Sequence, residues 1–386
     1  MHGGAGEPDR NAQLRNGAEG ERGASTRRAV ARARRLVVKV GSQLLAGSEG
    51  RARIEFLAAD VASLVRDGRQ VVVVSSGAIA LGMPRLGLRR RPAAMPLLQA
   101  AAAAGQSRLM HAWEEALAAH GLVAAQVLLT HADLAERDRW RAARATFEAL
   151  LGRGAVPVVN ENDTVAVDEI RFGDNDQLAA MLGTLVDAEL LVLLTDVEGL
   201  LDARGRRVPV VESFETAATL VRPGRSREGT GGMTSKLEAA RRATLRGVPV
   251  VVASVREPHA VTRIAAGEDV GTLFVPRGKS LGARRHWIAF TLRPRGTLLL
   301  DAGAVRAIVE QGRSLLPAGV LGVRGDFEPG DAVSLVGPDG REVARGLCRY
   351  GTRELARLAG SRSGAARNAR AQLAEVVHRD DLVVLP

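Results

Sequence analysis

Cysteine and histidine are scarce in this chain of 386 residues. Cys348 is the single cysteine, which excludes an intrachain disulfide framework and any metal site made of several thiolates. The seven histidines are scattered and lack the spacing of a metal-ligand motif. No metal site made by the protein alone is therefore expected, and no Ser/His/Asp order suggests a hydrolase.

Aromatic residues make up only 3% of the chain, which argues against broad stacking platforms for single-stranded nucleic acid. No apolar run approaches the ~20 residues that a membrane-spanning helix needs. The amino terminus lacks the apolar core of a secretory signal. Residues 1–34 are polar and rich in glycine and arginine, and we expect them to form a disordered tail. These features predict a cytoplasmic protein that does not enter membranes.

Lysine is also rare, with only Lys39, Lys236 and Lys279 among 54 basic residues. Lys39 and Lys236 both lie in glycine-flanked stretches, where a compact ammonium differs chemically from a planar guanidinium. The formal charge of +11 belongs to the two ends of the chain. Residues 36–276 hold 28 basic and 28 acidic residues, whereas residues 277–386 hold 18 basic and 11 acidic ones. Any affinity for polyanions is therefore expected at the ends.

The block at residues 35–276 alternates short Val- and Leu-rich runs with stretches of helical periodicity. Near-continuous apolar strands separated by helices are typical of an α/β fold, with an open, parallel-rich sheet sandwiched by helices. Ligands of such sheets bind at the carboxyl ends of the strands. The loops expected there are Gly41-Ser42, residues 75–78, residues 160–176 and Thr195-Asp196.

From residue 277 onward the pattern changes. Residues 277–293 are predicted to be a linker. Residues 294–386 contain short alternating strands broken by Gly, Pro and Asp turns, which predict a small β-barrel-like module with one helix.

Three strand-to-helix turns have the composition of anion-binding loops. "LVVKVGS" places Lys39 before a Gly-Ser turn, "SSGAI" follows a buried strand, and "GTGGMTSKLEAA" places Lys236 in the first turn of a helix. Free backbone N–H groups and a helix amino terminus suit phosphate, although no Walker A motif is present. Alone, each turn is more typical of packing, but three in one block favour phosphate binding.

The run "NENDTVAVDEIRFGDND", residues 160–176, holds six acids and three asparagines directly after an apolar strand. In a phosphoryl transfer such carboxylates would orient the lysines while the amides bind the acceptor. A solvated hairpin with Asx-turns and a helix N-cap at Asp174 or Asp176 is the alternative reading.

Together these motifs, with "AAAAGQSRLM", "AQVLLT" and "LLTDVEGL", resemble the glutamate 5-kinase family, which has the amino acid kinase fold. "HWIAF" and "GRSLLPAGVLGVRGDFEPGD" resemble the PUA module of its bacterial members. The likeness covers residues 35–386. Arg171, where a lysine is common, and the order Thr234-Ser235 depart mildly from the family pattern.

The resemblance implies ATP-dependent phosphorylation of the L-glutamate γ-carboxylate, with Mg²⁺ carried by the nucleotide. It also implies proline feedback and a dimeric or tetrameric state. The catalytic residues it implies are Lys39, Lys236, Asp176 and Asp174, and the glutamate-binding residues are Ser76, Asp163, Asn175 and Asn160. The ATP-binding residues it implies are Lys39, Thr195, Asp196, Thr230, Gly231, Gly232, Met233, Thr234, Ser235 and Lys236.

The sequence leaves open two alternatives to the phosphorylation of glutamate. A sister kinase of the same fold would phosphorylate aspartate, acetylglutamate, carbamate or a nucleotide. An RNA-binding role would rest on the basic PUA-like module and would show steep salt dependence. We expect the module to be mainly regulatory or structural.

Overall fold

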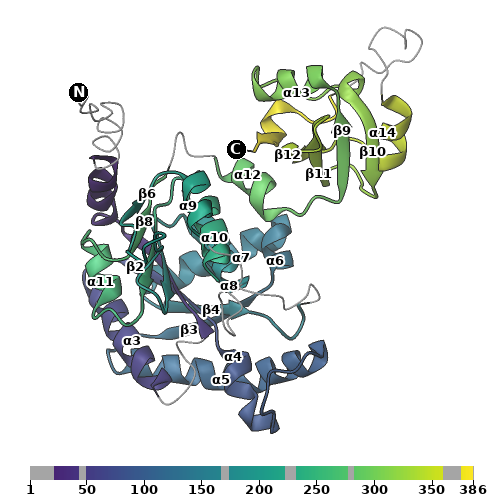
Figure 1. Cartoon of the computed structure of the whole chain (residues 1–386). Helices are drawn as coiled ribbons and strands as arrows, with labels where there is room; N and C mark the ends of the chain where they lie inside the picture. Colours follow the sequence, from purple (N-terminus) through teal and green to yellow (C-terminus); the bar gives the residue numbers. More distant parts are fainter. Residues whose placement is uncertain are drawn as a thin grey trace, which may run out of the picture. The chain divides into compact units, whose positions relative to one another are not determined.

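The computed structural model describes residues 21–42, 49–166, 174–221, 232–276, 282–359 and 375–385. The chain divides into two compact units, Met1–Ser280 and Leu281–Pro386 (Figure 1). None of the described helices is long and apolar enough to cross a bilayer.

Unit one is built on an eight-stranded sheet with strand order β3-β4-β2-β1-β5-β7-β8-β6. Every neighbouring pair is parallel except β7 and β8, which are antiparallel. The strands are β1 (Arg35–Val40), β2 (Gln70–Ser75), β3 (Ala124–Leu129), β4 (Val156–Glu161), β5 (Leu190–Thr195), β6 (Val210–Val211), β7 (Val250–Ser254) and β8 (Thr272–Phe274). The α/β fold with a parallel-rich sheet is confirmed.

Helices accompany the strands of unit one. They are α3 (Gly50–Arg66), α4 (Ala78–Gly82), α5 (Met95–Ala118), α6 (His131–Ala135), α7 (Arg137–Gly152), α8 (Asp174–Leu185), α9 (Phe214–Leu220), α10 (Met233–Leu245) and α11 (Ala260–Ala265). Apolar residues of α3, α5 and α11 share one core cluster, and those of α7, α8 and α10 share another.

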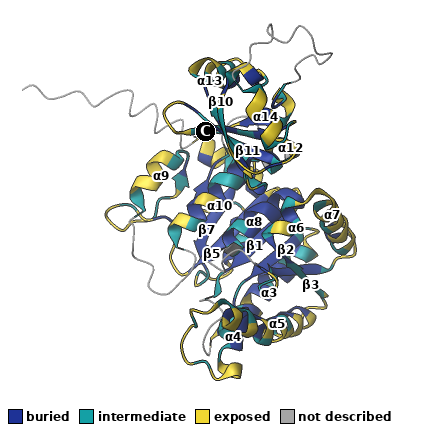
Figure 2. Cartoon of the chain, turned by 90° about the vertical axis from the view of Figure 1, so that its right-hand side faces the viewer, coloured by how far each residue is buried: buried dark blue, intermediate teal, exposed yellow. Residues whose placement is uncertain are grey.

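Strand β1 shows how the two clusters share the sheet. Leu36, Val38 and Val40 belong to the cluster of α3 and α5, whereas Val37 belongs to the cluster of α8 and α10. Successive side chains of a strand point to opposite faces, so Lys39 lies on the same face as Val37. In Figure 2 the dark blue of buried residues is concentrated in the strands of the sheet, β1 among them, and in α8. The alternation therefore directs a lysine toward the two helices that carry other site residues.

The disordered tail expected over residues 1–34 is wrong for residues 21–34. Residues 21–30 are helical, and Val30 and Ala33, three positions apart, are buried in the core cluster of α3 and α5. Arg27 also donates a hydrogen bond of 2.5 Å to Asp269. Two buried apolar residues and one ion pair thus order a segment whose overall composition is polar. Residues 1–20 lie outside the described part of the chain.

Unit two contains a five-stranded sheet of order β10-β9-β11-β12-β13, antiparallel except for the pair β9 and β11. Its strands are β9 (Gly296–Leu300), β10 (Val320–Gly325), β11 (Ala332–Val336), β12 (Glu342–Leu347) and β13 (Leu382–Val384). Its helices are α12 (Ala283–His286), the π-helical turn η2 (Trp287–Thr291), α13 (Ala302–Val309) and α14 (Thr352–Leu358). The prediction of a single helix in this module is therefore wrong.

The predicted linker at residues 277–293 also differs from the structure. Residues 283–291 are helical, and Ile288 and Ala289 are buried against Val383 of β13. The apolar residues of "HWIAF" give this segment a core to pack on, so it belongs to unit two.

Candidate active site

A buried cluster of three charges lies between β1, α8 and α10. Lys39 Nζ lies 2.6 Å from Asp176 Oδ1, and Lys236 Nζ lies 3.2 Å from Asp176 Oδ2. Asp176 is fully buried, and each lysine is only 4% exposed. The three groups together carry a net charge of +1, which suits them electrostatically to an anionic ligand.

Local structure brings these residues together. Lys39 is near the carboxyl end of β1, Asp176 is the third residue of α8, and Lys236 is the fourth residue of α10. Gln177 Nε2 donates to the backbone oxygen of Ser235 at 3.2 Å, which ties the first turns of the two helices to each other. Two helix amino termini beside two lysines are a favourable setting for phosphate oxygens.

Burial is the main influence on the charge of Lys39. Desolvation lowers the pKa of its ammonium below the ordinary value of a lysine, Asp176 opposes that shift, and nearby Lys236 reinforces it. A ligand that brings negative charge to this cluster would favour the protonated form of Lys39.

A second cluster is made of amides and a hydroxyl. Asn175 Nδ2 donates to Ser76 Oγ at 2.5 Å and to Asn160 Oδ1 at 2.9 Å. Asn160 Nδ2 in turn donates to Gln106 Oε1 at 2.9 Å. Asn175 Oδ1 is buried and has no hydrogen-bond partner among the described residues. Because Asn175 precedes Asp176 in α8, the amide cluster adjoins the lysine cluster.

Close packing of α4 against α5 positions the amide cluster. A Cβ on Gly82 would lie 1.8 Å from the carbonyl oxygen of Ala101, and a Cβ on Gly105 would lie 1.8 Å from that of Ala78. Only glycine permits this approach at either position. It holds the turn after β2, which contains Ser76, close to the turn of α5 that contains Gln106.

The other predicted residues occupy loops at the carboxyl ends of strands. Asp163 lies in the turn after β4 and is half-buried. Thr195 ends β5 and donates to Asp196 Oδ1 at 3.1 Å, while Asp196 itself is exposed. Both loops therefore follow strands close to β1 in the sheet.

The predicted nucleotide loop is described only in part. Gly232 precedes α10, and Met233, Thr234 and Ser235 form its first turn. Thr230 and Gly231 lie outside the described residues, as does Arg171, and Asp174 is described only as the first residue of α8. The hairpin that is the alternative interpretation of residues 160–176 would include residues 167–173, which lie outside the described residues.

Gln106 and Gln177 were not predicted as site residues. The only sequence signal for Gln106 is a polar residue directly after a glycine in an alanine-rich helix. Gln177 follows the "GDND" motif, and its neighbours in the sequence are typical of any helix. Their contacts with Asn160 and Ser235 depend on elements far apart in the chain, which composition does not reveal.

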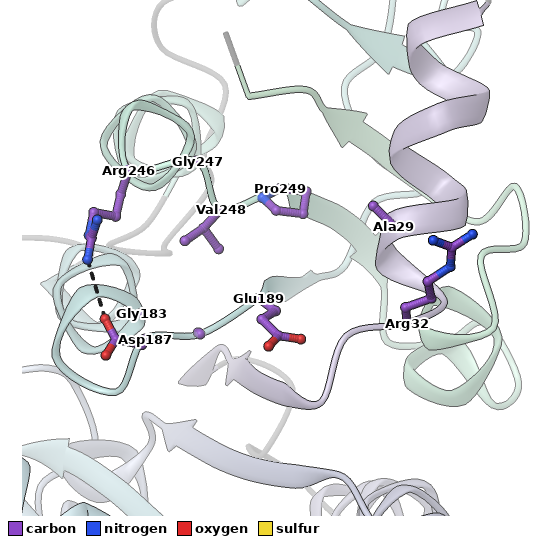
Figure 3. Close-up of a pocket in the computed structure, with 10 residues that line it drawn as sticks. Ala29, Arg32, Gly183, Asp187, Glu189, Arg246, Gly247, Val248 and Pro249 are labelled. Atoms are coloured by element: carbon purple, nitrogen blue, oxygen red, sulfur yellow. Dashed lines mark hydrogen bonds and ion pairs between the residues drawn. The ribbon is translucent and has the colours of Figure 1, made fainter. Parts of the chain in front are cut away.

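A surface pocket lies at the opposite ends of the strands, where β5 and β7 begin (Figure 3). It is lined in part by Arg32, Asp187, Glu189 and Arg246, and Asp187 and Arg246 form an ion pair of 3.3 Å. None of the predicted site residues lines it. The predicted site residues that the structure describes therefore lie away from this pocket.

Comparison with known proteins identifies the families that the two units resemble. The model of the amino acid kinase family matches residues 34–254, and that of the PUA domain matches residues 296–369. Glutamate 5-kinase of Myxococcus xanthus is 50% identical over 370 residues, which cover 93% of this chain and 98% of that protein. This chain belongs to the glutamate 5-kinase family.

Other glutamate 5-kinases are similarly related. That of Anaeromyxobacter dehalogenans is 50% identical over 377 residues, and that of Geobacter metallireducens is 47% identical over 364 residues. They cover 93% and 91% of this chain, and each match covers 98% of the relative. A solved structure of Giardia carbamate kinase has a TM-score of 0.48 and 16% identity, covering 63% of this chain and 99% of that one.

Proposed function

We propose that this chain catalyses the ATP-dependent phosphorylation of the γ-carboxylate of L-glutamate, the first step of proline biosynthesis. The observation that carries the proposal is the pairing of Lys39 and Lys236 with the single carboxylate of Asp176, beside the amide cluster of Asn175. Membership of the glutamate 5-kinase family supports glutamate as the acceptor.

The reaction needs no general base. A γ-carboxylate oxygen of glutamate is already ionised at neutral pH and attacks the γ-phosphorus of ATP. A new oxygen–phosphorus bond forms, the bond between that phosphorus and the β,γ-bridging oxygen breaks, and ADP leaves with the electron pair. The products are γ-glutamyl phosphate and ADP. The demand on the protein is to bring two anions together and to stabilise the charge of the transferring group.

In this proposal Lys39 and Lys236 contact the transferring phosphoryl group, and Asp176 holds both ammonium groups in place. The two ion pairs, to different oxygens of one carboxylate, support this division of roles. Asp174, one residue before Asn175, is proposed to lie near the nucleotide and its metal.

Ser76, Asn160, Asp163 and Asn175 are proposed to bind glutamate. Thr195, Asp196 and the stretch at residues 230–236 are proposed to bind ATP. The start of α10 beside that stretch supports phosphate binding there.

The nucleotide is proposed to enter as its Mg²⁺ complex. Among the described residues no group of three or more His, Cys, Asp or Glu side chains could hold a metal ion. Asp176 is already engaged by two lysines. The donor set therefore fits a metal held chiefly by phosphate oxygens, and Mg²⁺ counts here as part of the substrate.

We further propose a cytoplasmic homo-oligomer, dimeric or tetrameric, that is inhibited by proline. Family membership is the support for all three statements. RNA binding by unit two is the second candidate function, favoured by the PUA match and by the excess of basic residues after residue 277. Binding to a structured RNA that weakens steeply with salt and does not require Lys39 would favour it.

A coupled assay of ADP release tests the proposed reaction. With L-glutamate and MgATP we expect ADP release, and hydroxylamine should trap the acyl phosphate as a hydroxamate. Aspartate, acetylglutamate, carbamate and nucleotides serve as competing acceptors. Faster turnover with one of these, or no hydroxamate with glutamate, would overturn the proposal.

A further inference from the structure

The hydrogen bonds between the amides of this cluster all run in one direction, from donor to acceptor. Asn175 donates to Asn160, and Asn160 donates to Gln106, so three amides are joined head to tail. The series ends at Gln106 Oε1, which acts as an acceptor. Reversing Asn160 alone would face oxygen with oxygen at one end and N–H with N–H at the other. The orientation of Asn160 is therefore coupled to the group that position 106 presents.

This direction decides what Asn175 offers to a ligand. Both N–H groups of Asn175 Nδ2 are engaged, by Ser76 and by Asn160. Its Oδ1 is consequently left as a buried acceptor without a partner among the described residues. Such an atom is costly to leave unsatisfied, so a bound ligand that donates a hydrogen bond would be favoured there.

Glutamate has one group that suits this atom. Its two carboxylates only accept hydrogen bonds at neutral pH, whereas its α-ammonium only donates them. An acceptor at Asn175 therefore selects the ammonium end of the substrate. Were the amide series reversed, Asn175 would present N–H groups instead and would lose this selectivity.

We propose that Gln106 is a positioning residue that sets the direction of the amide series, so that Asn175 Oδ1 binds the α-ammonium of the substrate. This inference rests on the proposed function. Gln106 acts through Asn160 and Asn175 and need not contact the substrate itself. Its position in α5, directly after the glycine that allows α4 to approach, fixes the place from which it acts.

The test compares L-glutamate with glutarate, which has both carboxylates but no ammonium. The Michaelis constant for glutamate and the inhibition constant of glutarate are measured in the full-length protein. In Gln106→Met we expect affinity for glutamate to fall about tenfold, as for one lost charge-assisted hydrogen bond. The inhibition constant of glutarate should change less than about twofold, because glutarate makes no such bond.

Gln106→Glu is the conservative variant, since a carboxylate keeps the acceptor that Asn160 requires. It should retain the preference for glutamate over glutarate. Gln99→Met is the control, because it makes the same change in the same helix at a glutamine that donates to the backbone oxygen of Ala166. It should change the binding of glutamate and of glutarate by the same factor.

Three results would overturn the role of Gln106. In the first, Gln106→Met weakens the binding of glutamate and of glutarate equally. In the second, Gln106→Met changes the binding of neither compound. In the third, Gln106→Glu loses the preference for glutamate over glutarate as fully as Gln106→Met does. A wild-type protein that releases ADP with another acceptor but not with glutamate would instead overturn the proposed function itself, and this inference with it.

Discussion

Lys236 and Asp176 stand 60 positions apart in the chain, and their side chains meet at 3.2 Å inside unit one. The same carboxylate holds Lys39 on its other oxygen. One aspartate thus fixes the separation of two lysines that come from a strand and from a helix.

Replacing Asp176 with asparagine should impair both catalysis and folding. The variant keeps the shape of the side chain but leaves two buried ammonium groups without their shared carboxylate. We expect kcat to fall at least about 100-fold and the free energy of unfolding to fall by about 3–5 kcal/mol. ADP release and urea denaturation measure the two effects.

Asp187→Asn is the matched control for that variant. Asp187 also binds two basic side chains, Arg144 and Arg246, but it is 46% exposed and lies beyond the far end of α8. Its left-handed backbone, with φ of 48°, is well tolerated by asparagine. Its loss should cost less than about 1 kcal/mol and leave kcat unchanged. Equal effects of the two variants would contradict the special role of Asp176.

Replacing Lys39 or Lys236 with arginine should abolish most of the activity although the charge is kept. A guanidinium is larger and planar, and in a site this buried it cannot take the place of a compact ammonium. We expect kcat to fall at least about 100-fold in each variant. Arg246→Lys, the reverse exchange at the other end of α10, should have little effect. Near-normal turnover of both arginine variants would refute the assigned roles.

The sequence predicted the sheet well because its central strands are nearly uninterrupted runs of Val and Leu, which need no tertiary information to be recognised. It also placed Lys39 near the carboxyl end of a strand and Lys236 in the first turn of a helix, as the structure has them. It did not predict the helix at residues 21–30, whose order depends on Val30, Ala33 and Arg27 meeting distant partners. Nor did it predict Gln106, whose contact with Asn160 joins elements far apart in the chain.

Activity and stability should respond to alkaline pH in opposite directions. Burial lowers the pKa of Lys39 from its usual 10.5, so Lys39 loses its proton at a lower pH than an ordinary lysine. The value of kcat/KM should therefore fall as pH rises through this lowered pKa, because the protonated form stabilises the phosphoryl group. Between the lowered pKa and 10.5 the unfolded chain binds more protons at this site, so the contribution of Lys39 to stability rises with pH.

Comparison with Lys39→Met isolates this contribution. Burial raises the pKa of the Cys348 thiol, which makes stability fall with pH above 9.0 in both proteins. Subtracting the unfolding free energies of the two proteins at each pH removes that shared effect. A difference that stays constant across alkaline pH would contradict the shifted pKa of Lys39.

The helix at residues 21–30 should stabilise unit one through Arg27. Its guanidinium donates to Asp269 and to the backbone oxygens of Glu268 and Pro209, and its side chain is only 14% exposed. Arg27→Ala should lower the free energy of unfolding by about 1–2 kcal/mol without changing kcat. Arg28→Ala, at an exposed neighbour, should change stability by less than about 0.5 kcal/mol. Equal losses from the two variants would show that Arg27 has no specific role.

Phosphoryl transfer should survive removal of unit two. Every residue proposed to touch substrate lies before residue 280, and the two core clusters of unit one contain no residue of unit two. A chain ending at Ser280 should therefore release ADP with L-glutamate, while its oligomeric state, measured by light scattering, or its inhibition by proline should change. Loss of all activity in a folded truncated chain would mean that unit two completes the active site. If turnover, inhibition and assembly all stayed the same, the regulatory or structural role expected for this module would be wrong.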